Sequence, residues 1–162
     1  VYTVKLEGAG LAGYQCVLMA LLRDERYVAN APDWAADIEA KCRAKVQDRL
    51  GLSAGDFRIE LRLIGVSASF GDLETATGSP AEVGVLGIVT APTEALANEI
   101  GKMLNPYLLH HPLTEEEEQP TFAFPFSPAE LNRGAIYGFH LNHVLQLSDP
   151  MEAFSLEVID HG

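Results

Sequence analysis

Apolar residues follow two different periods in the first third of the chain. Residues 1–6 and 14–22 are rich in Val, Leu and Tyr and predict two strands, separated by a glycine-rich stretch. From Asp33 onward the period lengthens, and an amphipathic helix is predicted that ends at Gly51. Its apolar positions are Trp34, Ile38, Cys42, Val46 and Leu50.

The middle of the chain contains two further strand patterns and a second helix pattern. Residues 57–65 alternate apolar and charged side chains, which predicts a half-buried strand. Residues 82–92 are apolar on both faces, as in an interior strand. Pro92 and Glu94 then mark the start of a helix, which we expect to break or kink at Asn105–Pro106.

The order of these elements predicts the fold class. From residue 14 the chain reads strand, helix, strand, strand, helix and a later strand, which is the order of a split βαβ unit. We therefore predict an α+β fold, a ferredoxin-like split βαβ sandwich with extra strands. At 162 residues the chain has the size of one domain, 1–162. Because it starts at Val1 within an apparent strand, we expect it to be the C-terminal part of a longer protein.

The segment after the second helix begins with a capping pattern and ends with a strand pattern. Ser127, Pro128 and Glu130 have the spacing of an N-cap, a first helical position and a capping box. One helical turn ending near Gly134 is therefore predicted. Residues 137–147 alternate apolar and polar side chains and predict a strand.

The strand period separates the two histidines of this segment. On a regular strand His140 shares the polar side with Asn142, whereas His143 lies with the apolar side chains. Imidazoles on opposite faces do not share one ion, and no Cys or acidic residue stands nearby to complete a zinc shell. We therefore expect no metal. The chain has neither the GxxxxGK[ST] phosphate loop nor the GxSxG nucleophile elbow, and no cofactor is expected.

Four residues are nonetheless candidates for chemistry or binding. His143 has two open interpretations, a hydrogen-bonded histidine at the edge of the core or a ring poised for proton transfer. His140 is the second candidate acid or base. Asn142 and Ser127 are candidate ligand-binding residues, although helix capping alone accounts for Ser127. His110–His111 follow a helix end, where a positive ring is favourable beside the helix dipole.

Charge and cysteine content restrict the partners and the location. The chain has 23 Asp and Glu against 11 Lys and Arg, a net charge of −12, which repels phosphate backbones and anionic lipid surfaces. We therefore expect neither nucleic acid nor membrane as a partner. Cys16 and Cys42 lack CxxC spacing and indicate buried, reduced thiols of a cytoplasmic protein, with a disulfide between them as the alternative. Glu115–Glu118 is interpreted as a solvated charge run, with cation chelation as the alternative.

Three stretches of the chain carry motifs whose order can be compared with that of a known protein family. They are VKLEGAGLAGYQ, EVGVLGIVTAPTEALANEI and FAFPFSPAELNRGAIYGFHLNHV. In order and spacing they resemble the C-terminal region of the acyclic terpene utilisation protein A family, the AtuA-like proteins, over nearly the whole chain. The last stretch is the most specific, and the positions that match the family pattern are Phe126, Ser127, Pro128, Glu130, Tyr137, Asn142 and His143.

The resemblance implies a cytoplasmic bacterial protein associated with the catabolism of branched, terpene-like acids through their CoA esters. AtuA-like proteins carry a larger N-terminal region. The chain is therefore expected to be a C-terminal structural or interaction domain that packs on that region, or forms a homo-oligomer, through the open face of its sheet. The alternative is part of an enzyme acting on a carboxylate or CoA-linked substrate, with His143 or His140 as acid/base and Ser127 and Asn142 as polar anchors. A small-molecule acid or a CoA ester is then the expected ligand.

Overall fold

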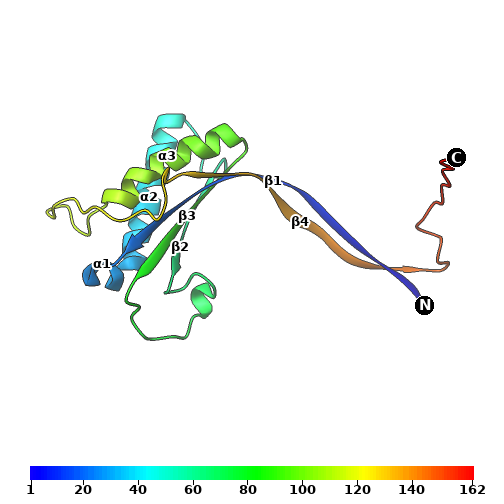
Figure 1. Ribbon diagram of the computed structural model, residues 1–162, viewed down its shortest axis with the longest axis horizontal. Helices are drawn as coiled ribbons and strands as arrows, with labels where there is room; N and C mark the ends of the chain where they lie inside the picture. The colour runs from blue at the N-terminus through cyan, green and yellow to red at the C-terminus, as the bar shows by residue number, and fades with distance from the viewer. The chain divides into compact units, whose positions relative to one another are not determined.

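The computed structural model describes all residues, Val1–Gly162, and they form two compact units. The sheet unit is Gly13–Ile136, and the ribbon unit combines Val1–Ala12 with Tyr137–Gly162. Two long strands, β1 and β4, each contribute residues to both units (Figure 1). The chain, whose length is typical of one domain, is therefore divided into two compact units of unequal size.

The protein is an α+β protein, as predicted. Its elements are β1 (Tyr2–Leu22), α1 (Glu25–Ala29), α2 (Ala31–Leu50), β2 (Arg58–Ile64), the 3₁₀ turn η1 (Gly71–Leu73), β3 (Val83–Ala91), α3 (Glu94–His110) and β4 (Leu131–Leu147). The strand order is β2-β3-β1-β4, and β3 pairs antiparallel with both β1 and β2. No helix combines the length and the apolar character needed to cross a membrane.

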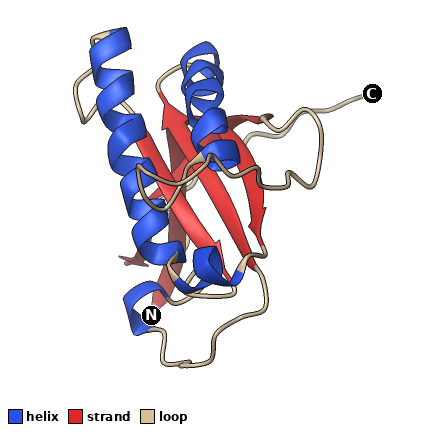
Figure 2. Ribbon diagram, turned by 90° about the vertical axis from the view of Figure 1, so that its left-hand side faces the viewer, coloured by secondary structure: helices blue, strands red, loops and turns tan.

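One face of the sheet is buried beneath α2 and α3, which lie over it side by side (Figure 2). The register of β1 against β3 places buried positions opposite one another, so that the two strands present one continuous apolar surface to the helices. The buried side chains of these strands are Cys16, Leu18, Ala20, Leu22, Val83, Val85, Val89 and Ala91. The helices contribute Ile38, Cys42, Val46, Ile100, Leu104 and Leu108, which belong to the predicted helical stripes.

The other face of the sheet is apolar at its centre and charged at one edge. Its central side chains are the half-buried Val17, Met19, Leu86 and Ile88, and the register pairs Val17 with Ile88 and Met19 with Leu86. On the neighbouring strand β2, Glu60 accepts hydrogen bonds from Arg58 at 2.7 Å and from Arg62 at 2.6 Å. The alternation predicted for residues 57–65 is confirmed.

β1 is one continuous strand, where the sequence predicted two. Its glycines do not interrupt it, because each part of the strand has a partner: residues 14–22 pair with β3, and Gly8 and Gly10 lie beside Leu141 and His140 of β4. A Cβ atom at residue 10 would lie 2.9 Å from His140 Cδ2. Glycine here allows a close approach of the two strands rather than a turn.

α3 continues through Pro106 to His110, so the helix does not break at Asn105–Pro106, where the sequence predicted a break or a kink. A proline inside a helix leaves the carbonyl group one turn earlier without its usual donor. Leu104 and Leu108, on either side of Pro106, are both completely buried. Packing of this last turn against the sheet compensates for the missing hydrogen bond.

The helical turn predicted to end near Gly134 is also absent. Residues 125–129 form bends and β4 begins at Leu131, so Ser127 does not cap a helix. The Glu130 carboxylate does not reach back to a cap but accepts a hydrogen bond of 2.7 Å from Asn105 Nδ2 of α3. Tertiary contacts to α3 and to the sheet therefore decide the conformation of a segment with a good local helix signal.

Gly101 provides a test of how closely α3 packs on β1. A Cβ atom at this position would lie 2.5 Å from Cys16 Sγ. Alanine normally stabilises a helix by about 1 kcal/mol relative to glycine, but here we expect Gly101→Ala to destabilise the protein by about 1–3 kcal/mol through overpacking. The measurement is the free energy of unfolding in urea. Gly78→Ala, where a Cβ atom meets nothing within 4 Å, is the control.

Truncating the opposing side chain separates overpacking from a general loss of helix stability. The double variant Gly101→Ala/Cys16→Ala should be more stable than the sum of the two single effects predicts, because the clash exists only when both side chains are present. Strict additivity of the two changes would contradict the contact.

Candidate functional site

The four residues proposed from the sequence lie in two different units. The strand predicted for residues 137–147 is confirmed as part of β4, and His140, Asn142 and His143 lie exposed on it in the ribbon unit. Their spacing directs His140 and His143 to opposite faces of the strand. Ser127 is exposed in the sheet unit.

The surroundings of His143 differ from those of a core-edge histidine. Its neighbours at alternate positions, Tyr137, Phe139 and Leu141, are 70%, 71% and 46% exposed. The apolar side of the strand therefore faces outward in this chain and does not enclose the imidazole. No group of three or more His, Cys, Asp or Glu side chains is arranged to hold a metal ion.

Both cysteines are buried free thiols, as predicted. Burial raises the pKa of Cys16 to about 11, and the nearby Glu130 carboxylate adds to this effect. Burial also raises the pKa of Cys42 to about 11. Because the thiolate is the nucleophilic form, neither side chain is activated for covalent chemistry at neutral pH.

A more complete polar cluster lies in the sheet unit, where α2 meets the end of α3. His111, the residue after α3, is buried, and its Nε2 lies 2.7 Å from Asp37 Oδ2. Trp34 Nε1 donates a hydrogen bond of 2.8 Å to the backbone carbonyl oxygen of His111. Trp34 and Asp37 are three residues apart and thus share one side of α2, so both contact the same residue.

The charge of Asp37 determines the direction of the bond to His111. Lys41 Nζ lies 2.7 Å from Asp37 Oδ2, and hydrogen bonds from Lys41 and then His111 lower the pKa of the carboxyl group. The carboxylate is therefore ionised at neutral pH and acts only as an acceptor. It follows that His111 Nε2 carries a proton and donates to Asp37.

An aromatic group beside this cluster holds the loop that follows α3. The rings of Tyr27 and Phe122 pack edge to face with their centroids 4.8 Å apart. The rings of Trp34 and Phe122 pack in the same way with their centroids 5.4 Å apart. Tyr27 Oη donates a hydrogen bond of 3.1 Å to Glu117 Oε2, and Arg26 forms an ion pair with the same carboxylate. The loop is thus attached to α1 and α2 by apolar and polar contacts together.

Glu117 differs from the rest of its acidic run. Desolvation opposes its ionisation, but hydrogen bonds from Arg26, Tyr27 and the Leu113 backbone N–H outweigh that effect and lower the pKa of its carboxyl group. The other members of Glu115–Glu118 are exposed, as a solvated run predicts. One residue of the run is therefore a structural anchor, which the sequence interpretation did not anticipate.

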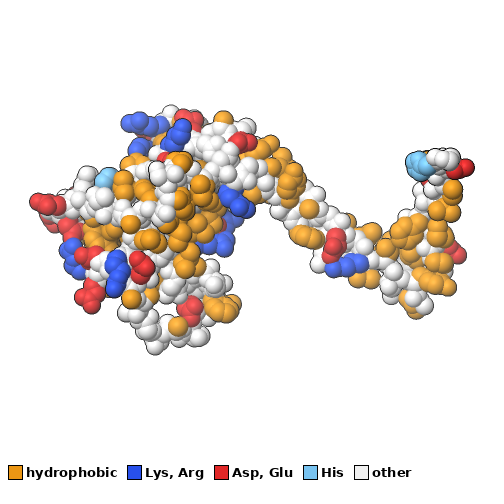
Figure 3. All heavy atoms as spheres, viewed as in Figure 1, with side chains coloured by type: hydrophobic (Ala, Val, Ile, Leu, Met, Phe, Trp, Pro, Cys, Tyr) orange, Lys and Arg blue, Asp and Glu red, His pale blue; other side chains and the backbone are white.

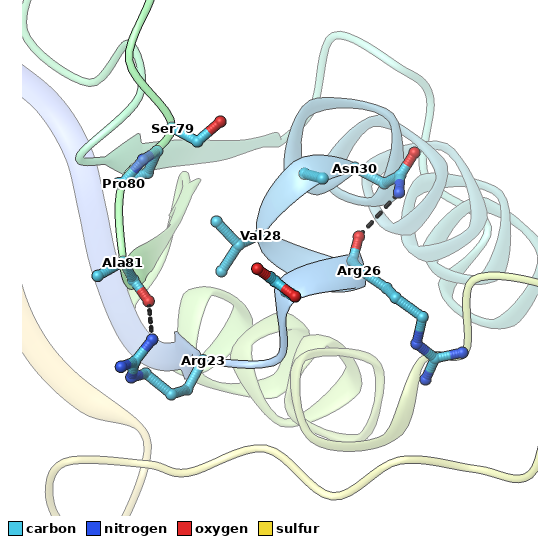
Figure 4. A pocket seen from close by; sticks show the side chains of 9 residues that line it. Arg23, Arg26, Val28, Asn30, Ser79, Pro80 and Ala81 are labelled. Atoms are coloured by element: carbon cyan, nitrogen blue, oxygen red, sulfur yellow. Dashed lines mark hydrogen bonds between the residues drawn. The ribbon is translucent and has the colours of Figure 1, made fainter.

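A cavity of about 770 Å³ lies between α1 and the loop that precedes β3 (Figure 4). Arg23 and Arg26 line it, and an arginine pair is a common anion-binding arrangement. Arg23, however, donates to the Ala81 carbonyl oxygen, and the guanidinium of Arg26 points away from Arg23 toward its partner Glu117. Both cations thus already have acceptors within the protein, which weakens the cavity as an anion site.

The sequence analysis did not identify the Trp34–Asp37–His111 cluster, although part of the signal was present. A tryptophan in the first turn of an amphipathic helix must find an acceptor for its N–H group when it is buried. The acceptor, however, lies 77 residues away along the chain. Only the packing of α2 beside α3 brings the two together.

Comparisons with known proteins identified no relative of this chain. No protein-family model, no curated protein and no solved structure matches the chain. The chemistry of the described residues is therefore the basis for the functional proposals that follow.

Replacing Asp37 tests the electrostatic part of the cluster. Asp37→Asn should lower the free energy of unfolding at pH 7 by about 1 kcal/mol, a reduced value for a charged hydrogen bond because the carboxylate is half exposed. The pKa of Asp37 is lowered by folding, so its contribution is present above the ordinary value of about 4 and is lost as pH falls through the folded pKa. Wild type and variant should therefore converge in acid.

The measurement is chemical unfolding at several pH values, with Asp48→Asn as the matched control on the exposed side of α2. A constant difference between wild type and Asp37→Asn down to acid pH would contradict the assignment of charge to Asp37.

Proposed function

We propose that this chain is a non-catalytic structural and interaction domain of the AtuA-like type, associated with catabolism of acyclic terpenes or branched acyl-CoA esters. The three sequence stretches described above support the family. The strand order β2-β3-β1-β4 with antiparallel pairing supports a ferredoxin-like split βαβ arrangement for the sheet unit. The observation that carries the interaction role is the exposed apolar surface of the ribbon unit.

The ribbon unit has two paired strands and exposes most of its large apolar side chains. Two strands without a third element are at best marginally stable in water, because they have nothing on which to bury an apolar face. The exposed side chains of the paired strands include Tyr2, Leu11, Tyr137, Phe139, Leu141 and Val144, and hydrophobic atoms appear in orange along this unit in Figure 3. A surface of this kind is characteristic of a docking site.

The charge distribution favours a second copy of the chain as the occupant of this surface. The paired segments, residues 2–12 and 137–147, contain only Lys5 and Glu7 as charged residues, and these form an ion pair with each other. The whole chain has a net charge of −12, so two copies repel each other over most of their surface. Contact through these paired segments, whose two charges cancel, avoids this repulsion.

The position of β4 supports the same occupant. β4 is an edge strand of the sheet, and edge strands of monomeric proteins usually carry charges or prolines that prevent pairing with another chain. Residues 134–147 of β4 contain no Lys, Arg, Asp, Glu or Pro. Two such edges can pair antiparallel around a two-fold axis, which gives a closed dimer.

Charges placed on the ribbon test this interface. Wild type should sediment as a dimer, and Phe139→Lys/Leu141→Lys should sediment as a monomer, because two added charges per copy must lose their hydration in the contact. Phe70→Lys is the matched control, since Phe70 is 65% exposed in the sheet unit and should leave the dimer intact.

Sedimentation velocity over a range of protein concentrations gives the result. A wild type that remains monomeric throughout would contradict self-association. If that monomer instead bound the N-terminal region of an AtuA-like protein, the ribbon would have that region as its occupant and not a second copy.

The pathway assignment has a separate genetic test. Deleting the gene should abolish growth on an acyclic terpene as sole carbon source and leave growth on succinate unchanged. Complementation with His140→Gln/His143→Gln should restore growth fully if the chain is non-catalytic. Failure of this variant, when it is folded, abundant and still a dimer, would instead support the enzymatic alternative in which His143 or His140 is the acid/base.

A further inference from the structure

A second cavity, of about 330 Å³, lies at the end of α3 beside the His111 cluster. Its apolar wall consists of Pro106, Tyr107 and Pro112. Its polar lining residues are Lys45, His110, His111 and Gln119, and none of the lining residues is acidic. The volume lies at the small end of the range for ligand sites, about 300–1,000 Å³.

The charge of this lining contrasts with the rest of the protein. The chain has a net charge of −12, so an anion is repelled by most of the surface. Lys45 supplies a positive charge at the cavity, and its ammonium group lies 5.1 Å from the centre of the Tyr107 ring. A cation held over an aromatic face loses part of its freedom before any ligand arrives, so less entropy is lost when it binds an anion.

Both histidines that line the cavity have one ring nitrogen engaged by a fixed acceptor. His110 Nδ1 lies 2.8 Å from the Pro120 carbonyl oxygen, which can only accept, so Nδ1 carries a proton. His111 Nε2 donates to Asp37 in the same way. These bonds fix the orientation of the two rings. In a neutral ring the other nitrogen, Nε2 of His110 or Nδ1 of His111, is an acceptor, so the donors for an anion must come from other side chains of the lining.

The remaining polar side chains supply the hydrogen-bond donors that an anionic ligand needs. Gln119 offers an amide N–H₂ group, and Tyr107 a hydroxyl group that stays protonated because burial raises its pKa. Asp37, the nearest carboxylate described in the cluster, is already neutralised by Lys41 at 2.7 Å. The cavity thus combines amide and hydroxyl donors, a lysine that forms no ion pair and an apolar wall.

We propose that this cavity binds a small organic anion, a carboxylate whose charge pairs with Lys45 while its apolar body lies against Pro106, Tyr107 and Pro112. The site lies wholly within the sheet unit. It is therefore independent of the docking role proposed for the ribbon.

An NMR titration of the full chain distinguishes charge recognition from simple filling of the cavity. Sodium butyrate is the probe and butyramide is its uncharged isostere, both at constant ionic strength. Butyrate should cause saturable shifts of the backbone amides around Lys45, Tyr107, His110 and Gln119, with a Kd on the order of 1 mM. Butyramide should cause no saturable shift.

Lys45→Met should weaken butyrate binding by about tenfold or more, as loss of a charge-assisted hydrogen bond predicts. Lys102→Met, which removes an exposed lysine of α3 outside the cavity lining, is the matched control and should retain wild-type affinity. Spectra of both variants without ligand establish that each is folded.

Three results of the butyrate and butyramide titrations would overturn the proposal. They are no saturable shift up to about 10 mM butyrate, equal binding of butyramide, and unchanged affinity in folded Lys45→Met. An acetylated dipeptide with a free C-terminal carboxylate forms a second arm. Tighter binding of this peptide than of butyrate would assign the carboxylate to the end of a protein chain and would contradict a small-molecule ligand.

Discussion

The antiparallel pairing of β1 with β3 is the interaction on which the sheet unit depends. Nine residue pairs, from Tyr14↔Ala91 to Leu22↔Val83, hold the two central strands in register. A shift by one residue would direct every buried side chain of β1 to the open face. With the register as observed, α2 and α3 pack on one continuous apolar surface, and Gly101 of α3 approaches Cys16 closely because it has no side chain.

The polar features of the sheet unit follow from this packing. Once α2 and α3 lie side by side on the sheet, the first turns of α2 face the residues that end α3, and Trp34 and Asp37 reach His111. The N–H group of a buried tryptophan and the Nε2–H group of a buried imidazole thereby both find acceptors, which avoids the cost of unpaired donors. The cavity lined by His110, His111 and Lys45 is formed by the same end of α3.

The ribbon unit has a different physical character. Its strands are paired, yet its aromatic and aliphatic side chains remain exposed, and its hydrogen-bonding edge carries few of the charges that usually protect an edge. Packing within the chain thus buries the apolar side chains of the sheet unit, whereas many of those in the ribbon unit stay exposed. The two exposed histidines of β4, which the sequence singled out, lie on this surface rather than in an enclosed pocket.

The sequence by itself determined the features that depend on local periodicity. The α+β class, the stripes of both long helices, the end of α2 at Gly51 and the extended state of residues 137–147 all follow from which neighbouring positions are apolar. Gly51 takes a positive φ of 65°, which is the conformation that favours glycine at a helix end. The buried, free state of the cysteines was also predictable, because Cys16 lies within an apolar strand pattern and Cys42 lies on the apolar stripe of the predicted helix.

Only the tertiary structure decided the features that depend on partners far along the chain. Contacts made across the fold account for three such features. They are the continuity of β1 through its glycines, the continuation of α3 through Pro106 and the absence of the helical turn predicted after Ser127. The same holds for the anchor at Glu117 and for the His111 cluster, whose partners are 90 and 77 residues apart in sequence. Local propensities amount to a few tenths of a kcal/mol to about 1 kcal/mol for most residues and to about 3 kcal/mol for a proline inside a helix. At the positions named here, burial and hydrogen bonding between distant segments outweigh them.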